Sequence, residues 1–297
     1  RDLPMRWAEL GQVHRHEMSG VLHGLFRVRY FTQDDAHIFC TPEQLEDEVT
    51  AVLRFMLHIY ADFGFSDVRI ELSTRPPDSI GTDEMWANAE DALRHVLERE
   101  GTEYQLNPGD GAFYGPKIDV DVEDALGRRW QIATIQVDLT MLPERFALEY
   151  IDTDGQPRRP VVIHRAIFGS YERFIGIITE HYAGAFPTWL APVQARVLPV
   201  SEKFIDYART VHRRLREARV RAELDDRNEK LGYRIRDAQV RKVPYMLVVG
   251  GREAEQGTVS LRPRTGEDRG AVALDRVVAD LTAEIAARAA DLTVGRS

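Results

Sequence analysis

The sequence has little cysteine and no long hydrophobic run. Its one cysteine, Cys40, excludes an internal disulfide and suits a reducing cytoplasm. No apolar run approaches the roughly 18 residues of a transmembrane candidate, and no basic segment followed by an apolar one marks a secretory signal. We therefore expect a cytoplasmic protein without membrane association.

Common signatures of nucleotide binding and of hydrolysis are missing as well. The chain has neither a GxxxxGKS/T loop nor a GxGxxG motif after an expected strand. No Ser/His/Asp order suggests a hydrolase. Any bound nucleotide must therefore be held by arginines on a sheet.

The charges that are present divide unevenly between the two ends of the chain. Residues 195–297 carry 21 Lys and Arg against 16 Asp and Glu, a net charge of +5. That leaves 18 against 32, a net charge of −14, for residues 1–194, and −9 for all 297 residues. Such asymmetry suggests a polyanion-binding part joined to a part of another kind.

Two prolines in the segment FPTWLAPVQ, residues 186–194, mark a boundary, and we expect domains at 1–190 and 191–297. Beyond this segment, strands alternate with helices, which predicts a mixed α/β sheet covered by helices. The expected strands are ARVLPV, VRAEL, PYMLVVG and TVSLRP, and the expected helices run from about 202 to 218, 230 to 240 and 274 to 290.

The first part has an α+β pattern built on an antiparallel sheet, with long helices between several strands. Thr41 as N-cap, Pro42 at the first helical position and Gln44 in a capping box predict a helix over 42–63. The expected strands are QVHRHE, LFRVRYFTQDDAHIFC, VRIELS, KIDVDVED, RRWQIATIQVDL and RPVVIHRAIF, and a helix begins at Ser170.

Alternation along the expected strands groups polar side chains. Gln33, Asp35 and His37 share one strand face with Phe31 and Phe39, which favours a partly enclosed site over a solvated face. By the same rule Arg15 and Glu17 share a face, and so do Arg27 and Arg29.

Arg173 falls in the first turn of the helix that begins at Ser170, where the helix dipole disfavours a cation. It therefore needs an anionic partner. Glu172 is the structural candidate, and a bound polyphosphate is the functional one, because guanidinium groups suit bidentate phosphate contacts.

Two histidines lie on expected strands. His37 and His164 could bind zinc if they converge, but 127 residues separate them and spacing cannot show convergence. Taken alone, each would be an ordinary core or surface histidine.

Several blocks resemble one enzyme family. VHRHEMSGVLHGLFRVRYFTQDDAHIFC resembles motif 2 of class II aminoacyl-tRNA synthetases in the threonyl form, and IHRAIFGSYERFIGIITE resembles motif 3. LSTRP, GTDEMW, GAFYGPKID and WQIATIQVDL match further blocks in the family's order. The similarity continues through RNEKLGYRIRDAQVRKVPYMLVVG and so covers essentially the whole chain.

The resemblance implies an enzyme that activates L-threonine with ATP and Mg²⁺ and transfers it to threonine tRNA. Arg15 would hold the α-phosphate, and Glu17 would contact the adenine region. Arg27 and Arg173 would steady the polyphosphate, and Gln131 would complete the ATP site. Positioning and charge neutralisation suffice for this chemistry, without a protein nucleophile.

The resemblance also implies one zinc ion per subunit, with His37 and His164 as two of its three protein ligands. The family's zinc chelates the amino and hydroxyl groups of threonine and so rejects valine, which a plain pocket discriminates poorly. The implied threonine-binding residues are Gln33, Asp35, Tyr114, Lys117, Thr134 and Gln136.

In the second part, Asn228, Glu253 and Arg262 match anticodon-reading positions, and their side chains suit hydrogen bonding to base edges. A further group could contact the RNA backbone or simply be solvated. Its members are Arg227, Lys230, Arg234, Arg236, Arg241 and Lys242.

Motif 1, which builds the family's homodimer interface, is absent from this sequence, as are the zinc-binding cysteine and the editing region. Cys40 does not replace that cysteine, because it faces away from His37 on a strand, roughly 10 Å along. The first residue is Arg1, and we expect the natural start upstream. A noncatalytic tRNA- or RNA-binding fragment of synthetase ancestry remains the alternative.

Overall fold

The computed structural model describes residues 2–295 and divides into two units, Arg1–His181 and Tyr182–Ser297. The segment after His181 is bound to the second unit. Arg264 donates to the carbonyls of Ala185 and Phe186, each at 2.6 Å, and Arg221 donates to that of Ala191 at 3.0 Å. The predicted domain boundary after residue 190 therefore remains a prediction.

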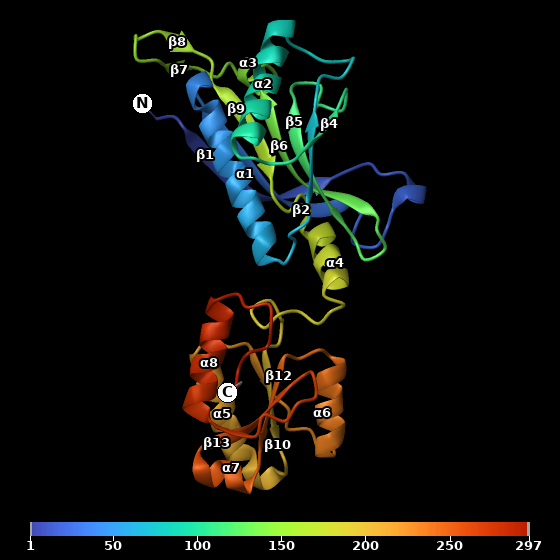
Figure 1. Ribbon diagram of the computed structural model, residues 1–297, viewed down its shortest axis with the longest axis vertical. Helices are drawn as coiled ribbons and strands as arrows, with labels where there is room; N and C mark the ends of the chain where they lie inside the picture. The colour runs from blue at the N-terminus through green and yellow to red at the C-terminus, as the bar shows by residue number, and fades with distance from the viewer. Residues whose placement is uncertain (1, 296–297) are drawn as a thin grey trace. The chain divides into compact units, whose positions relative to one another are not determined.

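The first unit is built on a seven-stranded sheet with the order β1-β2-β9-β6-β5-β3-β4 (Figure 1). Every neighbouring pair is antiparallel except β3 and β4. The α+β antiparallel prediction is therefore confirmed. The strands are β1 Met5–His14, β2 Tyr30–Cys40, β3 Arg69–Ser73, β4 Gln105–Asn107, β5 Lys117–Glu123, β6 Arg129–Asp138 and β9 Val161–Ala166, and a separate hairpin pairs β7 Tyr150–Ile151 with β8 Pro157–Arg158.

The helices of this unit are α1 Leu45–Asp62, α2 Asp83–Arg99, α3 Met141–Arg145 and α4 Tyr171–His181. A 3-10 turn, Pro42–Gln44, leads into α1, and the Gln44 side chain accepts from the Thr41 N–H at 3.0 Å. That half of the predicted capping box is confirmed, and α1 packs on β2, β6 and β9. The sequence prediction did not specify α2, which Thr82 caps by accepting from the Met85 N–H at 3.2 Å.

Burial along β2 follows the predicted alternation. Asp34, Ala36, Ile38 and Cys40 are buried, whereas His37 and the other odd-numbered residues from 33 to 39 are only partly covered. Cys40 therefore lies on the face opposite His37, and burial raises the pKa of its thiol to about 12. The expectation that Cys40 cannot join the histidines is confirmed.

The first two expected strands are neighbours, but their bounds were wrong. The β1–β2 ladder ends where His14 pairs with Tyr30, so the connecting residues 15–29 lie outside the sheet. Contacts within this connection take the place of ladder pairing. Glu17 accepts from the Arg27 Nε at 3.1 Å through its carboxylate, and from the Arg29 Nε at 3.1 Å through its backbone carbonyl.

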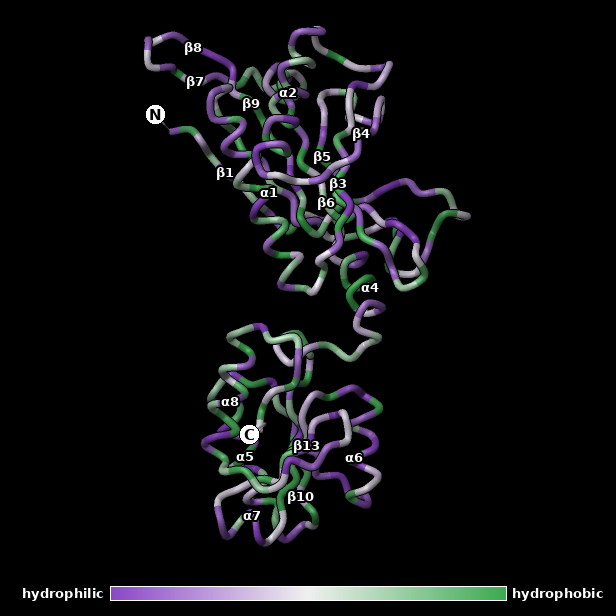
Figure 2. The backbone as a smooth tube through the Cα atoms, in the orientation of Figure 1, coloured by the Kyte–Doolittle hydropathy of each residue, from purple (hydrophilic) through white to green (hydrophobic). Residues whose placement is uncertain are grey.

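The second unit has a mixed five-stranded sheet with the order β11-β10-β12-β13-β14, which confirms the predicted architecture. Helices α5 and α8 cover one face and α6 the other (Figure 1), and β10 is largely hydrophobic (Figure 2). The strands are β10 Ala195–Pro199, β11 Ala222–Leu224, β12 Tyr245–Val249, β13 Thr258–Pro263 and β14 Ala271–Ala273; the helices are α5 Ile205–Glu217, α6 Leu231–Val240, α7 Gly251–Gln256 and α8 Leu274–Ala286, with a 3-10 turn, Glu202–Phe204, before α5.

Candidate active site and anticodon-reading loop

Strand register brings distant parts of the sequence into one row across the first sheet. His37 on β2 pairs with His164 on β9, His164 pairs with Gln136 on β6, and Gln136 pairs with Lys117 on β5. Four of the candidate site residues therefore lie on adjacent strands at the same level. Sequence spacing alone gives no such register.

An arginine-rich cleft of about 230 Å³ lies on this face of the sheet. Its walls include Arg15, Arg27 and Arg173. They also include Glu17, Gln33, Lys117, Gln131, Thr134 and Gln136, so nine of the residues that the resemblance singles out meet there. The structure thus brings together the nucleotide-binding candidates, although the 15–29 connection carries three of them outside any strand.

Hydrogen bonds hold the Arg173 side chain in place without neutralising its positive charge. Its Nε donates to the Phe26 carbonyl at 2.8 Å and its Nη1 to the Gln131 carbonyl at 2.7 Å. Its guanidinium carbon lies 5.5 Å from the centre of the Trp130 ring. Burial, followed by repulsion from nearby arginines, lowers the pKa of Arg173, which means that its positive charge is under-compensated.

The structural partner suggested for Arg173 is engaged elsewhere. Both oxygens of Glu172 accept from the Thr32 N–H, at 3.1 and 3.0 Å. No carboxylate of residues 2–295 forms an ion pair with Arg15 or Arg173, and only Glu17 pairs with Arg27, at 3.0 Å. The cleft therefore has an excess of positive charge that suits a polyphosphate.

One buried carboxylate that sequence reasoning missed orients two cleft residues. Asp119 on β5 accepts from the Lys117 Nζ at 2.5 Å and from the Gln131 Nε2 at 2.6 Å. Burial raises the pKa of Asp119, and the Lys117 ammonium opposes that rise. The alternation in KIDVDVED, which puts Lys117 and Asp119 on one face, is a signal that could have revealed it.

The two histidines converge, as the zinc hypothesis requires. Their ring centres are 4.7 Å apart. The His164 Nε2 lies 3.2 Å from an Asp138 carboxylate oxygen, which leaves Nδ1 as its free ring nitrogen. Among residues 2–295, no group of three or more His, Cys, Asp or Glu side chains could hold a metal ion. Both histidines thus fit as ligands, but they do not form a complete site.

An apolar groove of about 640 Å³ adjoins the histidines, and Asp35 and His37 line it. Tyr114 lies at the other side of the pair, with its ring centre 5.2 Å from that of His164. The Tyr114 hydroxyl donates to the Gln136 side-chain oxygen, and burial raises the pKa of Tyr114 to about 12. Three of the threonine-binding candidates, Asp35, Tyr114 and Gln136, therefore lie next to the histidine pair.

Two glycines allow the close packing that shapes these walls. A Cβ on Gly115 would lie 1.7 Å from the Val137 carbonyl oxygen, so only glycine lets the Tyr114 segment approach β6. Gly169 has φ +63°, and a Cβ there would lie 2.8 Å from the Ile132 carbonyl oxygen. That turn delivers α4 and Arg173 to the cleft.

The three anticodon candidates lie on different elements of the second unit. Asn228 is exposed on the loop between β11 and α6. The Glu253 carboxylate accepts from the Gly250 N–H at 2.9 Å at the start of α7. Arg262 on β13 forms an ion pair with Asp268. The two charged candidates thus already have partners within the protein.

Family comparisons agree with this architecture. A model of the class II tRNA synthetase core domain (G, H, P, S and T) matches residues 1–182, and a model of the anticodon-binding domain matches residues 194–284. The first unit is therefore a class II tRNA synthetase core domain. Prolyl-tRNA synthetase from Cryptosporidium parvum shares this fold, with a TM-score of 0.69 at 18% identity.

Closer relatives narrow the class. The RNA-binding domain of threonyl-tRNA synthetase from Cryptosporidium parvum superimposes with a TM-score of 0.89 at 46% identity, covering 95% of this chain and 71% of that one. Threonine–tRNA ligases from Caldanaerobacter subterraneus and Acidithiobacillus ferrooxidans are 60% and 58% identical over 97% and 95% of this chain. The chain belongs to the threonyl-tRNA synthetase family. It spans 45% and 44% of the length of those two ligases.

Proposed function

We propose that this chain carries the active site and anticodon-binding domain of a threonine–tRNA ligase (EC 6.1.1.3). The observation that carries the proposal is the cleft, where three guanidinium groups meet a single paired carboxylate beside two converging imidazoles. Such a site suits a polyanionic nucleotide next to a small polar substrate.

The proposed reaction has two steps. An oxygen of the threonine carboxylate attacks the α-phosphorus of ATP, and pyrophosphate leaves with its Mg²⁺. A ribose hydroxyl of the terminal tRNA nucleotide then attacks the carbonyl of threonyl-adenylate, and AMP leaves. Arg15 would neutralise the α-phosphate, and Arg27 and Arg173 would hold the polyphosphate, since this chemistry needs positioning and charge stabilisation.

Zinc fits the two histidines. His37 and His164 would supply two ligands, and the Asp138 hydrogen bond would fix the orientation of the His164 ring. When bound, zinc would hold the amino and hydroxyl groups of threonine, which excludes valine. The third ligand that the family resemblance implies is a cysteine, and Cys40, on the opposite face of β2, does not supply it.

The remaining site residues would complete substrate binding. Asp35 would accept from the threonine amino group, helped by Tyr114. Glu17 and Gln131 would bind ATP. Gln33, Lys117, Thr134 and Gln136 would line the threonine side of the site. In the second unit, Asn228, Glu253 and Arg262 would read anticodon bases.

The proposed setting is a cytoplasmic homodimer, as in the family. The edge strand β1 supports an interface, because Trp7 and Leu10 on it are 63% and 69% exposed. No helix in residues 2–295 is long and apolar enough to cross a membrane.

The alternative function is tRNA binding without catalysis. The observation in its favour is the incomplete ligand set at the histidine pair, given that residues 2–295 hold no third metal-binding side chain there. In that case the arginine cleft would be inherited from a synthetase ancestor and would not catalyse the reaction.

The deciding experiment is amino-acid-dependent ATP–pyrophosphate exchange by the full-length polypeptide, with threonine, valine and serine in parallel. We expect exchange with threonine and little with valine. Exchange with none of the three, together with retained binding of threonine tRNA, would establish the noncatalytic alternative.

A further inference from the structure

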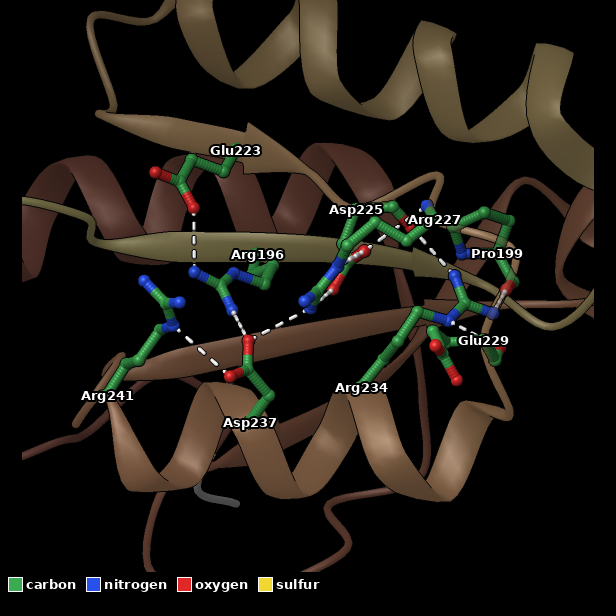
Figure 3. A network of polar contacts seen from close by, with 9 residues as sticks. All are labelled: Arg196, Pro199, Glu223, Asp225, Arg227, Glu229, Arg234, Asp237 and Arg241. Atoms are coloured by element: carbon green, nitrogen blue, oxygen red, sulfur yellow. Dashed lines mark hydrogen bonds and ion pairs between the residues drawn. The ribbon is translucent and has the colours of Figure 1, made fainter.

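The loop between β11 and α6 carries Asn228 and is held from both sides by charged groups. On one side, the Arg227 side chain donates to the two oxygens of Asp225, at 2.8 and 2.6 Å, and to Asp237 at 2.9 Å. Arg227 thus folds back across its own loop toward α6 (Figure 3). The residue directly before Asn228 is therefore immobilised by two carboxylates.

Asp237 ties this arginine to the sheet. The carboxylate oxygen that accepts from Arg227 also accepts from the Arg196 Nη1 at 3.0 Å, and the other oxygen accepts from the Arg241 Nε at 3.2 Å. Arg196 lies on β10, is only 5% exposed and donates to Glu223 on β11 at 2.8 Å. Asp237 is thus the shared partner of three guanidinium groups.

Arg234 fixes the loop backbone from the other side. It is 3% exposed and reaches from α6 to three carbonyl oxygens, those of Pro199 at 2.6 Å, Asp225 at 2.7 Å and Glu229 at 3.1 Å (Figure 3). A backbone hydrogen bond from the Glu229 N–H to the Arg227 carbonyl, at 2.8 Å, closes the turn over Asn228. Both neighbours of Asn228 are therefore anchored.

Asn228 differs from its neighbours. It is exposed, and no hydrogen bond of its side chain to another of residues 2–295 is present. A free carboxamide on a fixed loop can bind a base without first ordering the backbone, and such preorganisation raises both affinity and selectivity.

We infer that Arg227 is a positioning residue for base recognition: clamped by Asp225 and Asp237, it sets the loop so that the Asn228 carboxamide can read one anticodon base. The inference rests on the proposed function and deepens it. It reassigns Arg227, whose guanidinium is committed to carboxylates of its own chain, from the group of candidate phosphate contacts.

A phosphate contact and a positioning residue make opposite predictions. Losing a phosphate contact weakens binding to all RNAs alike and lowers the salt slope of log K by about one. Losing a positioning residue leaves that slope unchanged and removes part of the preference for the cognate base. The preference is the ratio of affinities for cognate and altered RNA.

The test uses the 297-residue chain and fluorescently labelled anticodon stem-loops, one cognate to threonine and others altered at single anticodon bases. Affinities are measured by anisotropy over a salt series for Arg227→Gln and, as the matched control, Arg241→Gln. Arg241 bonds the same Asp237 carboxylate, and within residues 2–295 its side chain forms no hydrogen bond or ion pair with the loop. Thermal unfolding establishes that each variant is folded, and Asp237→Asn provides a second way to release Arg227.

We expect Arg227→Gln to reduce the preference about 5- to 20-fold at one base with an unchanged salt slope, while Arg241→Gln keeps the preference. Asn228→Ala should lose the same preference, and the double variant should lose no more, because the two residues act in series. If Arg227→Gln keeps the preference for the cognate base and lowers the salt slope of log K by about one, Arg227 is a phosphate contact and the inference is overturned. A wild-type chain that binds all stem-loops equally would instead overturn the proposed anticodon reading itself.

Discussion

Arginines have different roles in the two units, and the net charge of each part of the chain does not indicate those roles. Residues 1–194, which contain the first unit, carry a net charge of −14, yet the cleft there gathers Arg15, Arg27 and Arg173 with one paired carboxylate. The part after residue 194 carries +5, yet Arg196 and Arg227 there are neutralised by carboxylates of the same unit. The sign of a whole domain is thus a poor guide to where an anion binds.

The partners of each guanidinium explain the difference. In the cleft, Arg173 is held by backbone carbonyls and Arg15 lies 5.0 Å from the centre of the Phe31 ring, contacts that fix a cation without cancelling its charge. A recess lined by uncancelled positive charge concentrates anions even within an acidic protein. In the second unit, paired arginines act as structural links.

The largest expected effect concerns a structural arginine. Arg234→Met removes the donor of three carbonyl oxygens, two of them in buried hydrogen bonds, and should lower the free energy of unfolding of the second unit by roughly 3–5 kcal/mol. The control is Arg236→Met on the exposed face of the same helix, which should cost less than about 0.5 kcal/mol. Urea denaturation measures both, and equal losses would show that Arg234 is not a structural link.

The next effect concerns the cleft. Arg15→Ala should reduce threonine-dependent pyrophosphate exchange by well over tenfold, about 1.4 kcal/mol or more, because a charge-assisted phosphate contact is lost. Arg54→Ala is the control, since Arg54 lies outside the cleft in an exposed pair with Glu100. Near-normal exchange in the Arg15 variant would refute the phosphate-binding role of Arg15. It would also remove the contrast between anion-binding arginines in the first unit and structural arginines in the second.

A smaller effect is expected at the second RNA-reading candidate. Arg262→Ala should remove preference for the cognate anticodon at the lower end of the roughly 1–3 kcal/mol of a bidentate base contact, because Asp268 competes for the guanidinium. Lys242→Ala should weaken all tRNAs alike, as a backbone contact carries no sequence information. The measurement is affinity for tRNAs with cognate and altered anticodons, and an equal loss for both in the Arg262 variant would make it a backbone contact.

The smallest effect is expected at Asp124, which pairs with an arginine of the first unit away from the cleft. Asp124 is fully buried and accepts from Arg128 at 2.6 Å and from Trp130 at 2.9 Å. Burial alone would raise the pKa of Asp124, but these hydrogen bonds outweigh it and hold the pKa well below the usual value. We expect Asp124→Asn to cost about 1 kcal/mol of stability at pH 7.

That cost should depend on pH in a defined direction. Because the folded-state pKa lies below the unfolded value of about 3.9, the contribution of the carboxylate is complete above that pH and is lost as the pH falls further. Urea denaturation of wild type and Asp124→Asn at pH 7 and near pH 3 should therefore show a gap that narrows in acid. A constant gap would mean that the charge of Asp124 contributes nothing.

Sequence patterns predicted the parts of the fold that depend on local rules. Alternation along β2 separated Cys40 from His37 correctly, and the Thr41–Gln44 signal located the start of a helix within a few residues. The same patterns extended the first two strands too far, because the ladder ends at His14 and Tyr30, yet Arg15 and Glu17 still line the same cleft.

What the sequence could not supply were long-range partners. Local patterns could not show that register would place His37 beside His164. They gave no indication that Asp138 would orient His164 or that Arg234 would be buried, since both depend on contacts between separate elements. The family resemblance supplied candidate residues, whereas the geometry of their supports came only from the structure.

The position of Cys40 gives the molecule a built-in reporter. Its thiol has no exposed surface, lies in β2 and is held protonated by its high pKa, so reagents that attack thiolates cannot reach it in the folded state. It is the single cysteine of the chain, so its labelling rate measures how often the central sheet of the first unit opens, independently of the second unit. Slower labelling in the presence of ATP would reveal nucleotide binding without any assay of catalysis.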